Sequence, residues 1–300
     1  MAVRRLSRSP LRLNHDELRY EDDVSAARWQ KPMRVLIATD AWAPQVNGVV
    51  RTLETLGKQL VRLGHEVRFV TPDGFRTVPM PTYPEIRLAL FARRAVGRVI
   101  DGFRPDAIHI ATEGPLGLAT RRNCMRRGQS FTTSFHTRFP EYIHARFGVP
   151  TSWPYAGLRW FHGPATAVMV ATRTLEQDLT KRGFKNLRLW SRGVDTDLFR
   201  PGDKDWLGLP RPVFLYVGRV AIEKSIEDFL KLDLPGSKLV VGDGPQLGEL
   251  RVRYPNVRFA GPKFEADLAR HYAASDVFVF PSRTDTFGLV ILEALASGLP

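Results

Sequence analysis

The sequence predicts an α/β protein with two domains, each built on a mostly parallel sheet that helices cover on both faces. The chain has 300 residues, 43% of them hydrophobic and 25% charged. This composition is ordinary for a globular protein, and the length is close to the limit for one core. Short β-branched or apolar runs alternate with helical patterns, break at residues 192–212 and then start again. We therefore expect two units of the same class.

The first unit contains strand-like runs separated by helical stretches. The runs lie at 34–39, 66–71, 107–112, 131–136 and 167–172. Because parallel strands need a crossover between them, this spacing predicts a doubly wound sheet within residues 33–191. Residues 1–32 carry arginines and then acidic residues without an apolar stretch. We expect them to form a mobile tail, and they do not fit a secretory signal.

The second unit repeats the pattern after a linker at 192–212. Its strand-like runs lie at 213–217, 238–241, 257–260 and 276–280. Residues 213–300 are therefore the second predicted domain. In open parallel sheets, ligands bind at the carboxyl ends of the strands, so the residues just after each run are the candidate site residues.

The positive charge is concentrated in the first half of the chain. Lys and Arg number 44 against 31 Asp and Glu, a net charge of +13. Residues 1–150 contribute +10 from 24 basic and 14 acidic residues. A predicted amphipathic helix with an apolar side from Phe91 to Phe103 carries Arg93, Arg94 and Arg98 on the other side. That face is either solvated or lies against anionic lipid headgroups; no sequence signature favours nucleic acid as a partner.

The cysteine and hydropathy patterns exclude several classes of protein. Cys124 is the single cysteine, so there is no intrachain disulfide and no cysteine zinc cluster, which fits a reducing cytoplasm. No stretch approaches the roughly 18–20 apolar residues that a membrane-spanning helix needs.

Three segments that follow predicted strands carry candidate binding residues. Asn47-Gly48 precedes a predicted helix, and the exposed N–H groups at the start of a helix favour binding of a phosphate. An ordinary Asn-Gly turn explains the same two residues equally well. Gly218-Arg219 and then Glu223-Lys224 follow the run at 213–217. An arginine and a lysine together suit a diphosphate, and each alone could be a solvated charge.

The segment 280–294 gives the strongest signal. Asp285 lies in a polar loop, a helix is expected to begin near Phe287, and Glu293 falls on its second turn. This arrangement would bring Asp285 and the N–H groups of Phe287 and Gly288 to sugar hydroxyls, and Glu293 to a ribose. In the alternative, Asp285 is only the helix N-cap and Glu293 is a solvated charge.

Taken together, these motifs resemble the retaining nucleotide-sugar transferases of glycosyltransferase family 4. The matching pieces, in order, are Asn47-Gly48-Val49, Ser134-Phe135-His136-Thr137, Gly193-Val194-Asp195 with Phe199 and Pro201, Gly218-Arg219 with Glu223-Lys224, and Asp285 to Glu293. The resemblance covers residues 33–300 and implies a GT-B fold, in which two Rossmann-like domains face each other across a cleft. The N-terminal domain would hold the acceptor and the C-terminal domain the donor.

The resemblance also implies a role for each site residue. The diphosphate would bind Arg219 and Lys224 beside Gly218, and the ribose would bind Glu293. The transferred sugar would bind Asp285 with Phe287 and Gly288, and its anomeric centre would lie near His136. Asn47 and Gly48 would contact the sugar-phosphate region. Developing negative charge on the leaving phosphate would be stabilised by the two cations, so we expect no metal and no cofactor.

Three departures from the family pattern bear on these expectations. Asn47 replaces the first glycine of a Gly-Gly pair, and Asn tolerates a left-handed backbone. Asp285 stands where Glu is usual, and the shorter side chain could shift the sugar preference. The chain ends at Pro300, where family members continue, so we expect either a fragment or an incomplete second domain.

Other functions fit parts of the same sequence. Asp195-Thr196-Asp197 and Asp203-Lys204-Asp205 imitate the paired aspartates that hold a metal in another transferase class, but surface charge is the better interpretation. A glycoside hydrolase would need two carboxylates that flank a sugar, whereas Asp285 and Glu293 belong to one loop and helix. A non-catalytic relic that binds nucleotide or membrane is the third alternative.

The acceptor is expected to be a lipid or a glycan. Aromatic residues gather between Trp153 and His162, and they are either core or an interfacial surface. With the basic N-terminal half, they favour a lipid such as diacylglycerol or phosphatidylinositol. The predicted location is cytoplasmic, peripheral on the inner face of an anionic membrane.

Overall fold

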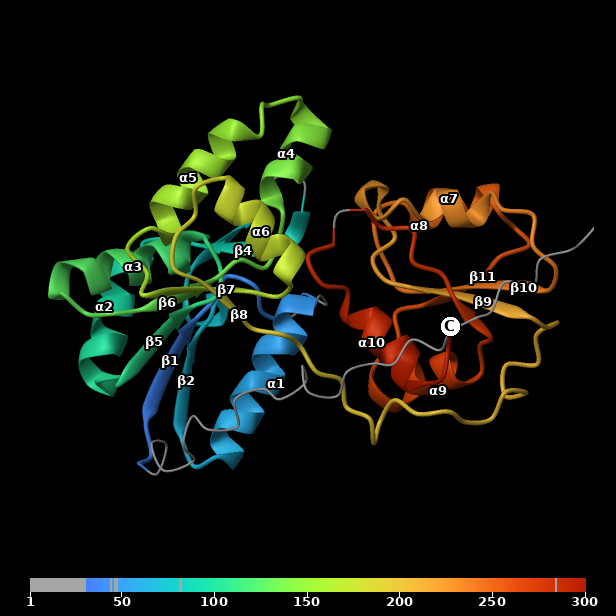
Figure 1. Ribbon diagram of the computed structural model, residues 1–300, viewed down its shortest axis with the longest axis horizontal. Coiled ribbons are helices and arrows are strands. Elements are labelled where there is room, and N and C mark those ends of the chain that lie inside the picture. Colours follow the sequence, from blue (N-terminus) through green and yellow to red (C-terminus); the bar gives the residue numbers. More distant parts are fainter. Residues whose placement is uncertain (1–30, 44, 46–47, 81–82, 284) are drawn as a thin grey trace, which may run out of the picture.

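The computed structural model describes residues 31–300 apart from 44, 46–47, 81–82 and 284. It contains two α/β domains that lie side by side, joined by an extended segment after residue 189 (Figure 1). Most of the predicted tail and Asn47 lie outside the described residues.

The N-terminal domain is built on a six-stranded parallel sheet in the order β2-β1-β5-β6-β7-β8. The strands are β1 (Arg34–Ala38), β2 (Glu66–Val70), β5 (Ala107–Ile110), β6 (Thr132–Ser134), β7 (Ala167–Val170) and β8 (Leu187–Leu189). The first five were predicted, each one to three residues longer than observed. The antiparallel hairpin of β3 (Thr77–Met80) and β4 (Tyr83–Ala89) was not predicted.

Helices cover both faces of this sheet. They are α1 (Gly48–Arg62), α2 (Ala92–Phe103), α3 (Pro115–Arg127), α4 (Phe139–Phe147), α5 (Ser152–His162) and α6 (Arg173–Lys181), with a short 3-10 turn at η3 (Pro72–Gly74). Side chains alternate across a strand, so in β1 Leu36 and Ala38 join the core under α2, α3 and α5, whereas Ile37 packs with Leu53 of α1. A strand buried on both faces explains the continuous apolar run.

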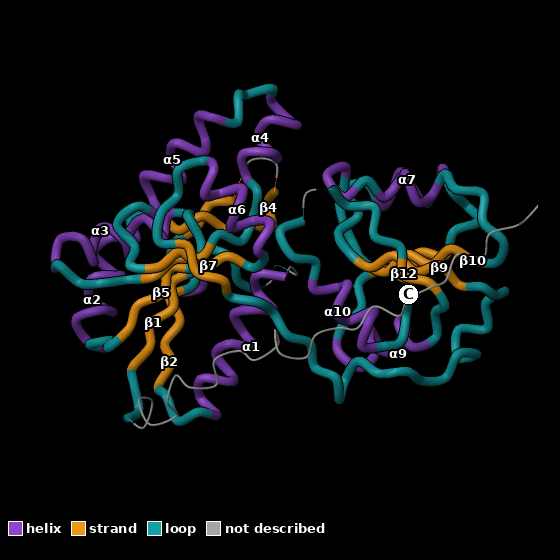
Figure 2. The backbone as a smooth tube through the Cα atoms, in the orientation of Figure 1, coloured by secondary structure: helices purple, strands orange, loops and turns teal. Residues whose placement is uncertain are grey.

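The C-terminal domain repeats the plan on a parallel sheet in the order β11-β10-β9-β12. Its elements are β9 (Val213–Val217), η4 (Ile222–Lys224), α7 (Ile226–Leu230), β10 (Ser237–Val241), α8 (Leu247–Arg253), β11 (Arg258–Gly261), α9 (Glu265–Ala273), β12 (Val277–Phe278) and α10 (Leu289–Ala296). The sheet lies between α7 and α8 on one side and α9 and α10 on the other (Figure 2). Tyr216 packs toward the first pair and Leu215 toward the second.

Two helix starts differ from the predictions. Helix α2 begins at Ala92, because Phe91 has a left-handed backbone (φ 54°) and its side chain is 92% exposed instead of joining the apolar face. Helix α10 begins at Leu289, and its N-cap is Gly288 with φ 79°. That backbone favours glycine, so neither Phe287 nor Asp285 starts or caps the helix.

The segments that follow the parallel strands bring the two domains into contact. The hydroxyl of Thr286, after β12, donates to the carbonyl of His136, after β6 (2.6 Å). In the first turn of α1, a Cβ added at Gly48 would lie 3.6 Å from Leu289 Cδ1 at the start of α10. The candidate site residues of both domains therefore gather along this contact.

Candidate functional site

His136 lies two residues beyond β6, in the part of the N-terminal domain that contacts the C-terminal domain. Its Nδ1 is 3.2 Å from Nη2 of Arg192, and its carbonyl accepts the Thr286 bond. Burial and then the nearby Arg192, His109 and His162 lower the pKa of His136 to about 3, so the ring is neutral. Its Nε2 is buried and has no hydrogen-bond partner among the described residues.

Lys224 and Asp285 lie together on the C-terminal side. Lys224 ends the turn η4, and its ammonium forms an ion pair with Oδ1 of Asp285. The two side chains are only 19% and 23% exposed. Asp285 Oδ2 is buried and lacks a hydrogen-bond partner in the described part of the chain. The residues expected to hold the diphosphate and the sugar are therefore direct neighbours.

Glu293 is buried on the second turn of α10, as the motif predicted, and both of its oxygens are engaged. Oε1 is 2.9 Å from Nη1 of Arg51, in α1 of the other domain, and Oε2 accepts from the Tyr272 hydroxyl at 2.9 Å. Burial raises the pKa of Glu293, and its bonds to Arg51 and Tyr272 offset this only in part. The alternative of a solvated surface charge is wrong, because the residue is 5% exposed.

Gly218 and Arg219 follow β9 in the loop that leads to Lys224. Gly218 N–H donates to the carbonyl of Val241 (3.0 Å), and a Cβ added at Gly242 would lie 1.9 Å from the Gly218 carbonyl oxygen. Glycine at 242 thus lets the loops after β9 and β10 touch. Arg219 is partly buried, and its carbonyl accepts from the Tyr216 hydroxyl (2.7 Å).

We call Arg51, His136, Lys224, Asp285 and Glu293 the interdomain cluster. The sequence had marked all of these except Arg51 as candidates. It had not marked Trp190 or Arg192, which contact the ring of His136. The sequence carried no signal for Arg51, which looks like any polar residue of an amphipathic helix. For Arg192 the weak signal was its place immediately before the Gly193-Val194-Asp195 motif.

The paired aspartates of the linker serve local turns. Asp195 Oδ1 accepts from the N–H groups of Asp197 (3.1 Å) and Leu198 (3.0 Å), and Asp203 Oδ1 accepts from the N–H of Asp205 (2.9 Å). All four aspartates are exposed. Within the described ranges, no three or more His, Cys, Asp or Glu side chains are grouped so that they could hold a metal ion.

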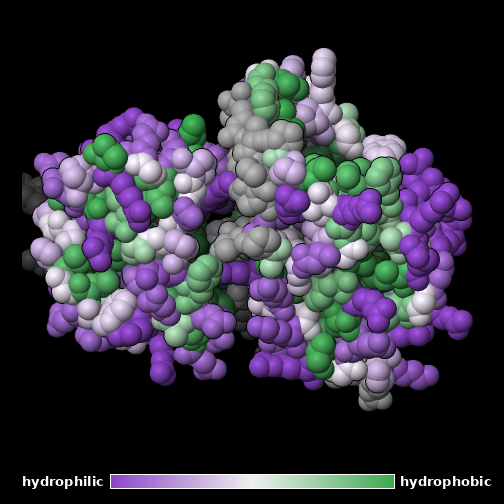
Figure 3. All heavy atoms as spheres, turned by 180° about the vertical axis from the view of Figure 1, so that it is seen from behind, coloured by the Kyte–Doolittle hydropathy of each residue, from purple (hydrophilic) through white to green (hydrophobic). Residues whose placement is uncertain are grey.

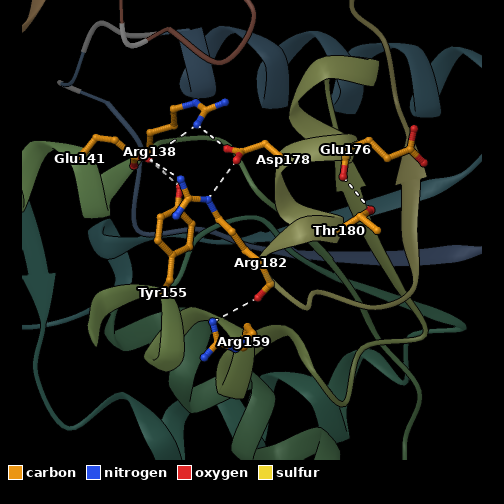
Figure 4. A network of polar contacts seen from close by, with 8 residues as sticks. All are labelled: Arg138, Glu141, Tyr155, Arg159, Glu176, Asp178, Thr180 and Arg182. Atoms are coloured by element: carbon orange, nitrogen blue, oxygen red, sulfur yellow. Dashed lines mark hydrogen bonds and ion pairs between the residues drawn. The ribbon is translucent and has the colours of Figure 1, made fainter. Parts of the chain in front are cut away.

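A second group of charges lies within the N-terminal domain, where it ties α4, α5 and α6 together (Figure 4). We call it the arginine network: Arg138, Glu141, Tyr155, Asp178 and Arg182. Oδ2 of Asp178 is 2.7 Å from Nη1 of Arg138, and its Oδ1 is 3.1 Å from Nε of Arg182. The Tyr155 hydroxyl donates to Glu141 (2.7 Å), and the Arg182 guanidinium lies 4.0 Å from the centre of the Tyr155 ring.

The predicted aromatic segment is partly core and partly surface. In α5, Tyr155 and Phe161 are buried, whereas Trp153 is 72% and Trp160 60% exposed. Arg121 of the basic helix α3 stacks 4.0 Å over the Trp160 ring. Seen from behind, the surface is mainly hydrophilic, with hydrophobic patches on both domains (Figure 3). None of the described helices is long and apolar enough to cross a membrane.

The sequence pattern described as Glycosyltransferase Family 4 matches residues 46–198, about half of the chain. The chain belongs to glycosyltransferase family 4. A pattern described as Glycosyl transferases group 1 matches residues 211–300 as well. The family inferred from the motifs is therefore confirmed, and the chain is a glycosyltransferase.

Named relatives of this family 4 chain act on several sugars. The GDP-mannose-dependent alpha-mannosyltransferase of Mycobacterium tuberculosis is 30% identical over 89% of this chain and 78% of its own length. The sulfoquinovosyl transferase of Arabidopsis thaliana is 30% identical over 90% of this chain and 59% of its own. The alpha-monoglucosyldiacylglycerol synthase of Acholeplasma laidlawii is 28% identical over 89% and 79%.

Solved structures of similar shape agree with the predicted GT-B fold of this family 4 chain. Sucrose-phosphate synthase from Thermosynechococcus elongatus has a TM-score of 0.70 at 22% identity, over 89% of this chain and 80% of that one. HepE from Anabaena, solved in complex with UDP, has a TM-score of 0.63 at 16% identity, over 89% and 79%. The fold class predicted from the sequence is confirmed.

Proposed function

We propose that this family 4 glycosyltransferase moves a hexose, mannose or glucose, from a nucleoside-diphosphate sugar to a membrane lipid, retaining the anomeric configuration and using no metal ion. One observation carries the proposal: His136 Nε2 and Asp285 Oδ2 are buried without a hydrogen-bond partner in the described part of the chain. The two residues belong to loops that touch, because the hydroxyl of Thr286, the residue after Asp285, donates to the carbonyl of His136. Buried polar atoms without partners are uncommon in proteins, and a bound ligand is one explanation for them.

A nucleotide sugar supplies the partners that these atoms lack. Its diphosphate competes with Asp285 for the ammonium of Lys224, and a sugar hydroxyl then donates to the released carboxylate. Free phosphate would offer the anion without the hydroxyls, and a free hexose the hydroxyls without the anion. A ligand that has both therefore exchanges the Lys224–Asp285 ion pair at the lowest cost in desolvation.

The charges of the C-terminal domain suit the reaction. As the glycosyl bond breaks, negative charge grows on the leaving diphosphate and the sugar becomes oxocarbenium-like. Lys224, held by Asp285, and Arg219, in the same loop after β9, are cations that would stabilise the leaving charge more than the ground state, and this difference would accelerate the step. The Glu293 carboxylate then accepts hydrogen bonds from the ribose hydroxyls, either in place of its bond from Arg51 or in addition to it.

The N-terminal domain has the surface for a lipid acceptor. Trp153 and Trp160 are exposed on α5, and the exposed Arg122 and Arg126 lie on the neighbouring α3. Aromatic side chains at an interface and cations near anionic headgroups both favour membrane attachment. The monoglucosyldiacylglycerol synthase named above supports a lipid acceptor. We place the protein peripherally on the cytoplasmic face of the membrane.

Donor binding gives the first test. The purified chain is heated with GDP-mannose, UDP-glucose, GDP, UDP or free mannose, and its melting temperature is recorded. We expect one nucleotide sugar to stabilise the protein more than its nucleotide does, and free hexose to have no effect. If no nucleotide or nucleotide sugar raised the melting temperature, donor binding would be refuted, and the proposed activity with it.

Transfer gives the second test. With the preferred donor, we expect glycolipid to form on vesicles that contain diacylglycerol or phosphatidylinositol, faster when anionic lipid is present and unchanged in excess chelator. The anomeric configuration of the product, read by NMR, should match that of the donor. Equal rates on soluble and vesicle-borne acceptors would contradict the lipid acceptor. Release of free sugar without acceptor would instead favour a hydrolase.

A further inference from the structure

Arg192 lies directly behind His136, in the segment that leaves the N-terminal domain. Its Nη2 points at His136 Nδ1 (3.2 Å), and its Nη1 donates to the carbonyl of Trp190 (2.7 Å). We propose that Arg192 is a positioning residue that makes His136 a hydrogen-bond donor, through Nε2, to a hydroxyl oxygen of the transferred sugar. The sugar contact rests on the proposed function, whereas the Arg192–His136 pairing does not.

The direction of the hydrogen bond follows from the chemistry of the two groups. A guanidinium has only donors, so Nδ1 of His136 must accept. A neutral imidazole carries one proton, and with Nδ1 as acceptor that proton is on Nε2. Nε2 is the atom that lacks a hydrogen-bond partner within the described residues. The pairing thus leaves one N–H free for a ligand at the domain contact.

The guanidinium is itself held in place. Its Cζ lies 4.1 Å from the centre of the Trp190 ring, and that ring also contacts His136, at 6.3 Å between centroids. The hydrogen-bond acceptors of Arg192 in the described chain are the carbonyls of Trp190 and Ser191 and the ring of His136. None of these is a carboxylate, so no direct ion pair neutralises the guanidinium beside the histidine.

The surrounding groups keep His136 neutral. Burial is the largest cause of its low pKa, followed by Arg192, His109 and His162, and Asp285 lies on the facing loop beside Thr286. His109 is also neutral, because burial and Arg192 lower its pKa to about 4. A ring with this pKa is a poor general base. A neutral donor, however, adds no positive charge beside a sugar that is itself becoming positive.

Nitrogen NMR of the histidines tests the pairing without substrate. In the wild-type chain we expect His136 to show protonated Nε2 and unprotonated Nδ1 from pH 5.5 to 8, with its signal assigned by comparison with His136→Asn. In Arg192→Met, which keeps the packing on Trp190, burial still disfavours the charged ring, so we expect the pKa of His136 to rise only in part. Without the guanidinium as donor, we expect the proton to be shared between Nδ1 and Nε2. Arg192→Lys is the conservative variant, because it retains a donor and a charge. Arg188→Met is the matched control, because it removes an exposed arginine nearby in the sequence.

Kinetics with GDP-mannose or UDP-glucose, whichever is transferred, test the consequence. Misplacing a contact in an active site can reduce the rate by up to about 10²-fold, so we expect Arg192→Met to lower kcat by about 10- to 100-fold with little change in donor KM. The loss should be greater at pH 5.5 than at pH 8, and Arg192→Lys should restore most of the rate.

Two results would overturn the proposal. One is a His136 ring in Arg192→Met whose proton remains on Nε2, with Nδ1 unprotonated, to the same extent as in the wild-type chain. The other is a loss of rate that is equal at every pH and not restored by lysine, which is what a merely structural role predicts. If the wild-type chain transferred no hexose, the proposed function would fail, and the NMR result would still decide the pairing.

Discussion

The arginine network and the interdomain cluster contain similar side chains in different arrangements. In the arginine network, two arginines meet two carboxylates inside one domain, and Asp178 is bound from both sides. In the interdomain cluster, the partners come from two domains: Arg51 reaches Glu293, and Thr286 reaches His136. Its carboxylates and its lysine are paired, yet Asp285 Oδ2 and His136 Nε2 are not.

This difference indicates which charges serve stability and which serve a ligand. Within one domain, a network can satisfy most of its buried polar atoms. Glu141 Oε2 is the one buried side-chain atom of the arginine network that has no hydrogen-bond partner among the described residues. A site that binds a ligand must leave donors and acceptors for it, at a cost in stability. Changes in the cluster should therefore affect activity first, and changes in the network should affect stability first.

The largest effect is expected from Lys224→Met. Without this cation, the charge on the leaving diphosphate loses a fixed partner, and kcat should fall by about 10²- to 10³-fold. The melting temperature should fall as well, because the partly buried carboxylate of Asp285 loses its ion-pair partner. Turnover of the preferred nucleotide sugar measures this, with Lys231→Met, an exposed lysine at the end of α7, as the control. A loss below threefold would place Lys224 outside the catalytic machinery.

Glu293→Gln should weaken nucleotide binding by about tenfold, or about 1.4 kcal/mol. Since burial raises its pKa above 4.5, the folded state binds the proton more tightly than the unfolded state. The ionised carboxylate therefore costs stability at neutral pH, and this cost vanishes as the pH falls below 4.5.

We accordingly expect Glu293→Gln to melt at the same or a higher temperature than wild type at pH 7.5, with the gap shrinking in acid. Titration calorimetry and thermal melts give the two quantities. Glu249→Gln, whose side chain is 57% exposed, is the matched control. Unchanged affinity together with a lower melting temperature would assign Glu293 to the stabilising group of charges instead.

Asp178→Asn, in the arginine network, should lower stability and leave activity nearly unchanged. Both arginines lose a charged partner, and because the three side chains are 21–34% exposed, solvent screens part of the loss. We expect the free energy of unfolding to fall by about 1–2 kcal/mol, and kcat to stay within about twofold. Denaturant unfolding measures the change, and Asp228→Asn, at an exposed pair with Arg283, is the control.

The pH dependence gives a further check on Asp178. Burial alone would raise its pKa, but the hydrogen bonds from Arg138 and Arg182 outweigh burial and lower it. Its stabilisation is therefore present at pH above 3.8 and is lost as the pH falls through the folded-state pKa. The difference between wild type and Asp178→Asn should disappear on the same course. A difference that persists unchanged in acid would contradict this origin.

The smallest effects are expected at the exposed tryptophans beside the network. Trp153→Ser and Trp160→Ser should each weaken binding to anionic vesicles by about three- to fivefold, because each removes an interfacial aromatic. Sedimentation with vesicles measures this, and Val252→Ser, 83% exposed in α8 of the other domain, is the control. If the three variants bind alike, α5 is not the membrane surface.

The predictions from sequence failed where the signal was short or distant. Strand β8 was missed because its three residues include Arg188 and are not part of a longer run such as the one at 131–136 that contains β6. The hairpin of β3 and β4 contains prolines that obscure alternation. The start of α2 was misplaced because Phe91 fits the helical spacing, although its left-handed backbone lies outside the helix. The candidate residues of the C-terminal domain could be named from the sequence because they lie in the loop after β9 and in the loop and helix after β12, within local motifs.

By itself, the sequence determined the fold class, the order of most strands along the chain and the residues that follow them. These depend on local patterns of apolar side chains, glycine and proline, which the chain carries in its order. Only the tertiary structure decided the partnerships. Arg51 and Glu293 are 242 positions apart, and Arg192 and His136 are 56 apart. Such pairs exist because the sheets assemble and the domains dock, and neither event leaves a mark in the sequence near the residues concerned.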